Sequence, residues 1–261
     1  MLVRDAGDAW QIVLQTDHAD LSAQLAAAWG GPGFERPEPY APLARAARRH
    51  DDGWAVWEQW PRLDGDGAPM SFGAVAAPVH LAFYRACVEA VADEDPAAGL
   101  LVSMHMSGLY RQRYGVMPVP PRALPEDVRD VVDAFVQQEE DRQVALRRML
   151  GLEEAWRWTS YALLQVFDIV SLYCCLADVE AGAPGACEGV PTSVGRDPVR
   201  VTIESRGPWR VRFDPHPFAA DEVRLALRRR LVRKREWLDD DAFRANLAVA
   251  PFETVEIAVE R

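Results

Sequence analysis

The stretch Ala46-Ala47-Arg48-Arg49-His50-Asp51-Asp52-Gly53-Trp54 places a histidine next to an aspartate at the end of a helix-like run. An imidazole nitrogen and a carboxylate oxygen from neighbouring residues can bind the same divalent or trivalent metal ion, and a carboxylate can also bridge two ions. We therefore predict that His50 and Asp51 form the centre of a metal site. Residues elsewhere in the chain would complete it.

Further candidate ligands lie on the apolar faces of other predicted helices, where hydrophobic residues recur at helical spacing. The intervals along the chain are long enough for each ligand to come from its own helix, so several helices would pack around one polar point. The candidates and their predicted helices are His18 in 16–29, His50 and Asp51 in 43–50, His80 in 78–95, His105 in 99–110, and Asp168 in 153–178.

Asp168 decides between a metal site and a set of ordinary core residues. It lies in the most apolar run of the chain, residues 162–173, where an unpaired carboxylate costs several kcal/mol unless a pKa shift, an ion pair or a metal ion neutralises it. The alternative is that each buried histidine has a hydrogen-bonding partner of its own, and His216 is predicted to be structural in this way. The rivals of Asp168 for the carboxylate role are Asp127, Asp130, Asp133 and Asp141.

The pattern as a whole predicts a mostly α-helical protein with a β-rich C-terminal portion. The segment 99–110 fits a helix or a buried strand by periodicity, and we favour a helix. The other expected features are strands at 1–4 and 10–15, a proline-rich connector at 118–125, a helix at 125–150, a linker-like segment at 182–198, alternating strands at 199–203, 209–213 and 255–259, and a strand or helix at 223–237. We expect a helical domain at 1–182 and a β-rich extension at 183–261.

The composition limits the kinds of partner that the protein is expected to bind and the compartment in which it is expected to lie. The 261 residues carry a net charge of −11 with a pI near 5.0, and this charge argues against binding to nucleic acid or to an anionic membrane. No apolar run reaches the roughly 18 to 20 residues that span a bilayer, and the first residues lack the features of a signal peptide. We expect a cytoplasmic protein with reduced cysteines and a small-molecule substrate, whose strand edges could also pair in a homodimer.

Three motifs resemble an uncharacterised bacterial family, domain of unknown function 3891: Gln15-x-Asp17-His18, His50-Asp51-x-Gly53-Trp54 and Ser103-x-His105-x-Ser107-Gly108-Leu109-Tyr110. Across residues 15–175, the order His, His-Asp, His, His, Asp is also similar to that of the HD-domain superfamily, in the subgroup that binds two metal ions. This second resemblance implies an HD-domain-like helical bundle. One departure is that Asp52-Gly53-Trp54 replaces the usual small residue and lysine, and that lysine often helps to bind phosphate in hydrolytic members.

The HD-domain resemblance also implies a distribution of ligands between two ions. His18, His50, Asp51 and Asp168 would hold the first ion, His80 and His105 would hold the second, and Asp51 would bridge them. Asp51, His80 and His105 are then the predicted catalytic residues. Iron is the expected metal, with manganese or zinc as alternatives.

The first functional hypothesis is a metal-dependent hydrolase acting on a phosphate ester or a nucleotide-like substrate. Two ions would lower the pKa of a bridging water and stabilise the oxygens of the transition state. Arg111 and Arg113 follow the His105 segment and could receive a phosphate, although plain surface charge is the alternative.

Two other hypotheses stay open. Resemblance to the oxygen-using branch of the HD-domain superfamily implies a diiron oxygenase, and the aromatic residues Trp54, Trp57 and Tyr110 would then enclose a small organic substrate. The third hypothesis is a non-catalytic protein whose core is stabilised by metal and whose β-rich part is an interaction module. Ligand number does not distinguish the first two hypotheses, because hydrolases with two metals use the same ligands.

Overall fold

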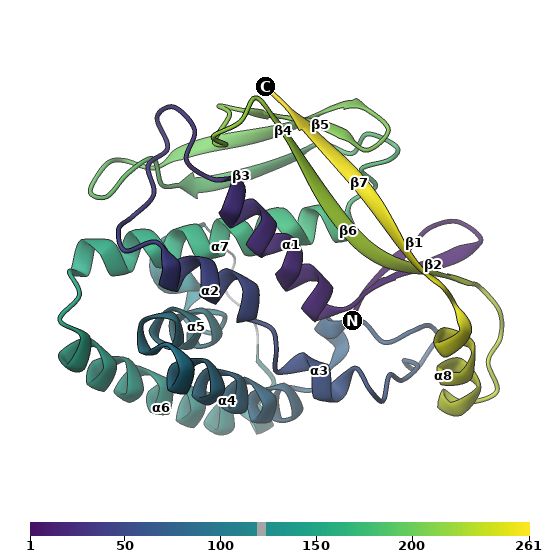
Figure 1. Cartoon of the computed structure of the whole chain (residues 1–261). Helices are drawn as coiled ribbons and strands as arrows, with labels where there is room; N and C mark the ends of the chain where they lie inside the picture. The colour runs from purple at the N-terminus through teal and green to yellow at the C-terminus, as the bar shows by residue number, and fades with distance from the viewer. Residues whose placement is uncertain (119–123) are drawn as a thin grey trace.

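One seven-stranded sheet joins the two ends of the chain (Figure 1). The computed structural model describes residues 1–118 and 124–261, so most of the connector predicted at 118–125 lies outside the described residues. The strand order is β1-β2-β6-β7-β5-β4-β3, with β5 and β7 parallel and the other neighbours antiparallel. The strands are β1 (Leu2–Asp5), β2 (Ala9–Val13), β3 (Gly185–Val190), β4 (Val199–Gly207), β5 (Arg210–Asp214), β6 (Glu222–Arg233) and β7 (Phe252–Glu260).

Most helices lie on one side of this sheet in successive layers (Figure 1), whereas α8 packs with Ile12 of β2 and Val232 of β6, which point to the other face. Helices α1 and α7 contact the strands, α2 and α5 pack beneath them, and α4 and α6 form the layer farthest from the sheet (Figure 1). The helices within the described residues are α1 (Gln15–Ala28), α2 (Ala41–Arg49), α3 (Trp54–Trp57), α4 (Ala77–Glu94), α5 (Pro96–Gly108), α6 (Glu126–Leu150), α7 (Glu154–Leu176) and α8 (Asp240–Val249), with the short 3-10 turns η1 (Phe72–Ala74) and η2 (Gln112–Gly115).

The sheet buries one face because apolar residues alternate along its central strands. In β6, Leu225 and Leu227 are buried and pair with Ile257 and Val255 of β7. Arg224 and Arg228 of β6 lie on the exposed face, where Arg228 stacks on the ring of Phe252.

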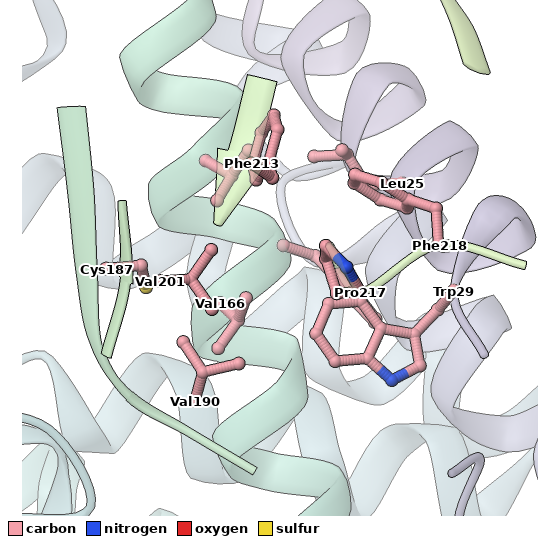
Figure 2. A pocket seen from close by; sticks show the side chains of 11 residues that line it. Leu25, Trp29, Val166, Cys187, Val190, Val201, Phe213, Pro217 and Phe218 are labelled. Carbon is pink, nitrogen blue, oxygen red and sulfur yellow. The ribbon is translucent and has the colours of Figure 1, made fainter. Parts of the chain in front are cut away.

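The contact between the sheet and α7 is a closed apolar core rather than a ligand site. Figure 2 shows the side chains around a small cavity in this core, among them Trp29, Val166 and Phe213. The cavity volume is about 10 Å³, which is at the lower limit for a single water molecule, and apolar cavities of this kind stay dry.

The predicted fold class is wrong. About 48% of the chain is helical and 21% is strand, so the protein is not an HD-like helical bundle with a separate β-rich end. The N-terminal strands β1 and β2 continue the C-terminal sheet through the pairing of β2 with β6, and strands from both ends of the chain thus form one mixed sheet. The domain division at residue 182 stays a prediction.

Most predicted helices are confirmed, and the C-terminal half contains the local errors. The segment 99–110 is the helix α5, whose first turn is capped by the Asp95 carboxylate accepting from the backbone N–H groups of Ala97 and Ala98. Strand β3 lies inside the predicted linker, where only Cys187 and Val190 of six residues are buried. The ambiguous stretch 223–237 is mostly strand β6, and α8 was not expected.

Helix α7 is long and apolar enough to cross a membrane by length and composition. However, 72% of its most apolar 18-residue stretch is buried inside the protein, which is typical of a core helix of a soluble protein. The chain therefore looks soluble, and the cytoplasmic location stays a prediction.

Candidate metal centre

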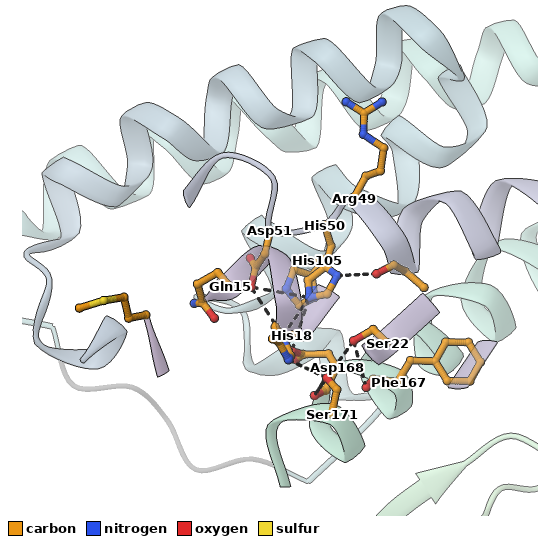
Figure 3. A network of polar contacts seen from close by, with 12 residues as sticks. Gln15, His18, Ser22, Arg49, His50, Asp51, His105, Phe167, Asp168 and Ser171 are labelled. Atoms are coloured by element: carbon orange, nitrogen blue, oxygen red, sulfur yellow. Dashed lines mark hydrogen bonds and ion pairs between the residues drawn. The ribbon is translucent and has the colours of Figure 1, made fainter. Parts of the chain in front are cut away.

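Five of the predicted ligands meet at one buried point between four helices (Figure 3). His18 comes from α1, His50 and Asp51 follow the last residue of α2, His105 comes from α5 and Asp168 from α7. The exposed fraction is 7% for Asp51 and 4% or less for the other four residues. We call these five residues the histidine cluster.

The contacts within the histidine cluster are short. His18 Nε2 lies 3.3 Å from His50 Nε2 and 3.2 Å from Asp168 Oδ1. Asp51 Oδ2 lies 3.7 Å from the Nε2 atoms of both His18 and His50, and the His105 ring meets the His50 ring edge-on with centroids 5.0 Å apart. His18, His50 and Asp168 form one group of potential ligand atoms within 4.8 Å of one another, and His50, Asp51 and His105 form a second.

The hydrogen bonds behind the rings orient both Nε2 lone pairs toward each other. His50 Nδ1–H donates to the Ala47 carbonyl at 3.0 Å, because a carbonyl oxygen can only accept. Ser171 Oγ lies 2.9 Å from the Asp168 carbonyl oxygen and 2.7 Å from His18 Nδ1. When the hydroxyl donates to the carbonyl, His18 Nδ1–H donates to Ser171 Oγ. If Nδ1 carried the only proton of each ring, two lone pairs would face each other 3.3 Å apart, so a proton or a metal ion is needed between them. The raised pKa of His50 means that its ring supplies this proton when no metal ion is bound.

The pKa shifts in the histidine cluster show strong coupling between its charges. Burial lowers the pKa of His50, but the Asp51 and Asp168 carboxylates outweigh this effect and raise it to about 9. Burial raises the pKa of Asp168, yet hydrogen bonds from His18 and His50 bring it well below its usual range. Burial also raises the pKa of Asp51 and lowers that of His105 to about 3. Imidazole and carboxylate ligands in such a set suit zinc, manganese and iron, so the residues present fit a metal ion.

A strained turn carries a cation to the edge of the histidine cluster. Gln112, Arg113 and Tyr114 have φ angles of 50°, 51° and 50°, a left-handed conformation that costs L-residues roughly 1–2 kcal/mol each. Arg113 Nη2 lies 3.4 Å from Asp168 Oδ2, and the Arg113 side chain is 13% exposed. The turn thus holds a nearly buried guanidinium against the carboxylate oxygen that does not face the histidines.

His80 is not part of the histidine cluster. Its Nε2 lies 2.7 Å from the Tyr110 hydroxyl, its ring stacks on Tyr84 at 5.2 Å, and Trp54 meets it edge-on. His80 does not belong to either ligand group found among the described residues. The structure therefore places His80, Trp54 and Tyr110 together in an aromatic cluster rather than among the converging ligands.

The other predicted residues are widely separated. Arg111 pairs with Glu140 at the surface, with Nε 3.3 Å from the carboxylate oxygen. The Nε2 atom of His216 lies 2.8 Å from the Ala220 carbonyl oxygen. The four rival aspartates of Asp168, which are Asp127, Asp130, Asp133 and Asp141, lie exposed on α6.

Two polar residues of α7 were missed. Gln165 lies three residues before Asp168 and its side-chain amide is 2.9 Å from His105 Nδ1, while Ser171 lies three residues after Asp168 and contacts His18. Positions three apart share a helix face, so this spacing was a usable signal.

The structure also explains Gly53 of the His-Asp motif, because a Cβ atom at this position would collide with the Phe83 carbonyl of α4.

Histidines and carboxylates from four separate helices, converging in a buried site, define a candidate metal-binding protein with nitrogen and oxygen ligands. A family model described as "Protein of unknown function (DUF3891)" matches residues 1–234, and the chain belongs to this family. Neither the comparison with curated proteins nor that with solved structures gives a match.

Proposed function

We propose that this protein is a metal-dependent hydrolase that acts on a phosphate ester or a nucleotide-like small molecule. The observation that carries the proposal is the convergence of two histidine Nε2 atoms and one carboxylate oxygen, spaced 3.2 to 3.7 Å apart, in a fully buried cluster. The first ion would be held by His18, His50, Asp51 and Asp168. The order of ligands along the chain, which is similar to that of two-metal HD-domain enzymes, supports the same assignment.

Arg113 favours a phosphate ester as the substrate. The chain lacks a lysine after the His-Asp pair, and the guanidinium beside Asp168 supplies a cation at the edge of the cluster instead. Guanidinium groups bind phosphoryl oxygens through paired N–H donors. Arg113 would orient the phosphoryl group and stabilise the charge that develops on its oxygens.

The remaining roles follow from the contacts. A divalent ion bound by the histidine cluster would lower the pKa of a water molecule and polarise a phosphoryl oxygen. His18 and His50 keep their Nε2 atoms directed inward because Ser171 and Ala47 bind their Nδ1 atoms. Burial of all five residues keeps bulk water from competing for the same ligands.

A second ion remains part of the proposal. His105 and Asp51, which belong to one ligand group with His50, would hold it together with His80. His80 would have to exchange its contact with the Tyr110 hydroxyl for the ion, a change of partner at one imidazole nitrogen.

A diiron oxygenase is the alternative, and one observation favours it. The aromatic side chains of Trp54, Tyr84 and Tyr110 contact His80, and aromatic side chains commonly line the pockets that bind small organic substrates. The same cluster is compatible with the hydrolase, in which it would be part of the core.

Elemental analysis combined with turnover tests the proposal. Protein loaded with manganese or zinc should hydrolyse p-nitrophenyl phosphate, and Asp168→Ala should abolish this activity together with metal binding. Two irons per chain and an absorption band that responds to oxygen, without phosphatase activity, would instead support the oxygenase. A protein that takes up no metal after metal-supplemented expression would refute both.

A further inference from the structure

The hydroxyl group of Tyr161 is buried without a partner. Tyr161 lies on α7 and is 0% exposed, and its Oη atom has no hydrogen-bond partner among residues 1–118 and 124–261. A buried hydroxyl without a partner costs free energy that an apolar ring in its place would not. Other phenols of the chain avoid this cost; for example, the Tyr173 hydroxyl on the same helix donates to the Ala183 carbonyl at 2.6 Å.

Tyr161 belongs to the helix face that builds the histidine cluster. Tyr161, Gln165 and Asp168 are spaced by four and three residues, which brings them to one side of α7. Gln165 contacts His105, and Asp168 contacts His18 and His50. The phenol is therefore the next polar group along the stripe that the ligands occupy.

The backbone of α5 makes room for the hydroxyl. A Cβ atom on Gly108, one turn after His105, would collide with Tyr161 Oη. Glycine inside a helix destabilises it by about 0.5–1 kcal/mol relative to alanine, so this close approach has a cost of its own. The hydroxyl end of Tyr161 thus lies against α5 near His105.

Arg113 lies on the same side of the cluster. Its neighbour Tyr114 packs edge-on against Tyr161 with ring centroids 5.9 Å apart, while its guanidinium reaches Asp168. The Arg113 cation and the Asp168 carboxylate both influence the pKa of Tyr161, which burial raises far above its usual value. The phenol therefore stays protonated and offers an O–H donor within the electrostatic influence of the Arg113 guanidinium.

We propose that the Tyr161 hydroxyl and the Arg113 guanidinium form an anion subsite beside the histidine cluster, where they bind the phosphoryl oxygens of the substrate. This inference rests on the proposed function and names two groups that would recognise its substrate. A protonated phenol donates to an anionic oxygen and cannot repel it, and the guanidinium supplies the opposite charge. The bound phosphoryl oxygen would provide the partner that Tyr161 lacks.

A surface groove is separated from Tyr161 by Trp158, and we infer that a ligand would approach the subsite from it. It has a volume of about 370 Å³ and is lined by Gly115 and Val116 after the strained turn, by Trp158 and Ala162 of α7, and by Gly189 of β3. Trp158 also contacts the Tyr161 ring at 6.2 Å. A groove of this size accommodates a small phosphate ester.

The test compares two hydroxyl deletions on one helix. Binding of inorganic phosphate to the metal-loaded protein is measured by titration calorimetry, and the melting temperature is measured on the same samples with and without metal. Tyr161→Phe should weaken phosphate binding by about ten- to a hundredfold, the factor for losing one hydrogen bond to a charged group. Its melting temperature should stay equal or rise, because no internal hydrogen bond is lost. Tyr173→Phe should do the opposite, with unchanged phosphate binding and a lower melting temperature.

Additional variants and a second anion distinguish a failure of this inference from a failure of the proposed function. Arg113→Lys should weaken phosphate binding in the same range as Tyr161→Phe, while both variants keep the metal content of the unchanged chain. Acetate should bind more weakly than phosphate to the unchanged protein and should be less sensitive to Tyr161→Phe. Phosphate binding that depends on Tyr161 without ester turnover would support the subsite and refute the hydrolase. Turnover and phosphate binding that are both unaffected by Tyr161→Phe would overturn the subsite and leave the hydrolase standing.

Discussion

Helix α5 contributes residues to two buried polar clusters, and the buried polar groups are stabilised differently in each. One side carries His105 into the histidine cluster, and the other side carries Ser103 and Ser107 against α6, where they meet Glu139 and Gln143. We call these last four residues the serine cluster. Both clusters contain carboxylates that are nearly inaccessible to solvent, with Glu139 at 0% and Asp168 at 4% exposure.

In the serine cluster the contacts pair donors with acceptors, and Glu139 Oε1 is the one buried oxygen of these four side chains that has no hydrogen-bond partner among the described residues. Ser103 Oγ donates to Glu139 Oε2 at 2.9 Å, and Gln143 Nε2 donates to the Ser103 and Ser107 hydroxyl oxygens at 3.1 and 3.0 Å. Arg142 Nε adds a cation 3.2 Å from Glu139 Oε2. Burial raises the pKa of Glu139, and these donors oppose that shift.

In the histidine cluster the groups that face one another can all act as acceptors, and only added protons make the histidines donors. The Nε2 atoms of His18 and His50 point at one another, and oxygens of Asp51 and Asp168 lie beside them. A group of converging acceptors is stable only when a cation or protons lie between them. The comparison teaches that burial of polar groups alone does not indicate a metal site, whereas convergence of acceptors indicates a site that must hold a cation or protons.

Removal of metal should have the largest effect on stability. If the ion fills the histidine cluster, a chelator should lower the free energy of unfolding by about 4 kcal/mol, the linkage expected at a metal concentration about a thousand times Kd. Differential scanning calorimetry with and without chelator measures this loss. An unchanged melting temperature would mean that the histidine cluster is stable by itself, like the serine cluster.

Loss of the cation beside Asp168 should reduce activity strongly. Arg113→Gln is expected to lower kcat/KM for p-nitrophenyl phosphate by about a hundredfold, the effect of removing one preorganised donor to a developing charge. Arg45→Gln, which removes an exposed arginine paired with Glu94, serves as the control and should stay close to the unchanged chain. Equal rates for both variants would exclude Arg113 from substrate binding.

The serine cluster should respond to mutation in stability alone. Gln143→Leu removes the donor to two buried hydroxyl groups and should cost about 2 kcal/mol, measured by urea unfolding. Metal content should be unchanged, because none of the four residues contacts the histidine cluster in the described parts of the chain. Loss of metal in this variant would show that the two clusters are not independent.

The smallest expected effect concerns the orientation of His18. Ser171→Ala removes the hydroxyl that binds His18 Nδ1, and it should weaken metal affinity by about tenfold, as is typical for residues that orient a ligand. Competition with a chromophoric chelator measures this change. Ser22→Ala, which alters only the neighbouring hydroxyl 2.8 Å away from Ser171 Oγ, should have less effect, and the reverse order would contradict the assigned hydrogen bonds.

The sequence predicted the helices of the site better than the sheet. Helical periodicity places His18, His105 and Asp168 on buried faces, and these residues do converge. Strand β2 pairs with β6 more than 200 residues later, and no local pattern contains that partner. Local spacing likewise could not show that His80 faces Tyr110 or that a left-handed turn directs Arg113 to Asp168.

The central claim is tested most directly by the metal content of the purified protein, measured by elemental analysis on the unchanged chain and on three variants. The account predicts at least one ion per chain in the unchanged protein and in His216→Ala, and almost none in His50→Ala and Asp168→Ala, provided that all variants remain folded by circular dichroism. Normal loading of His50→Ala and Asp168→Ala would contradict it, because the ion would then lie somewhere other than the point where these side chains meet.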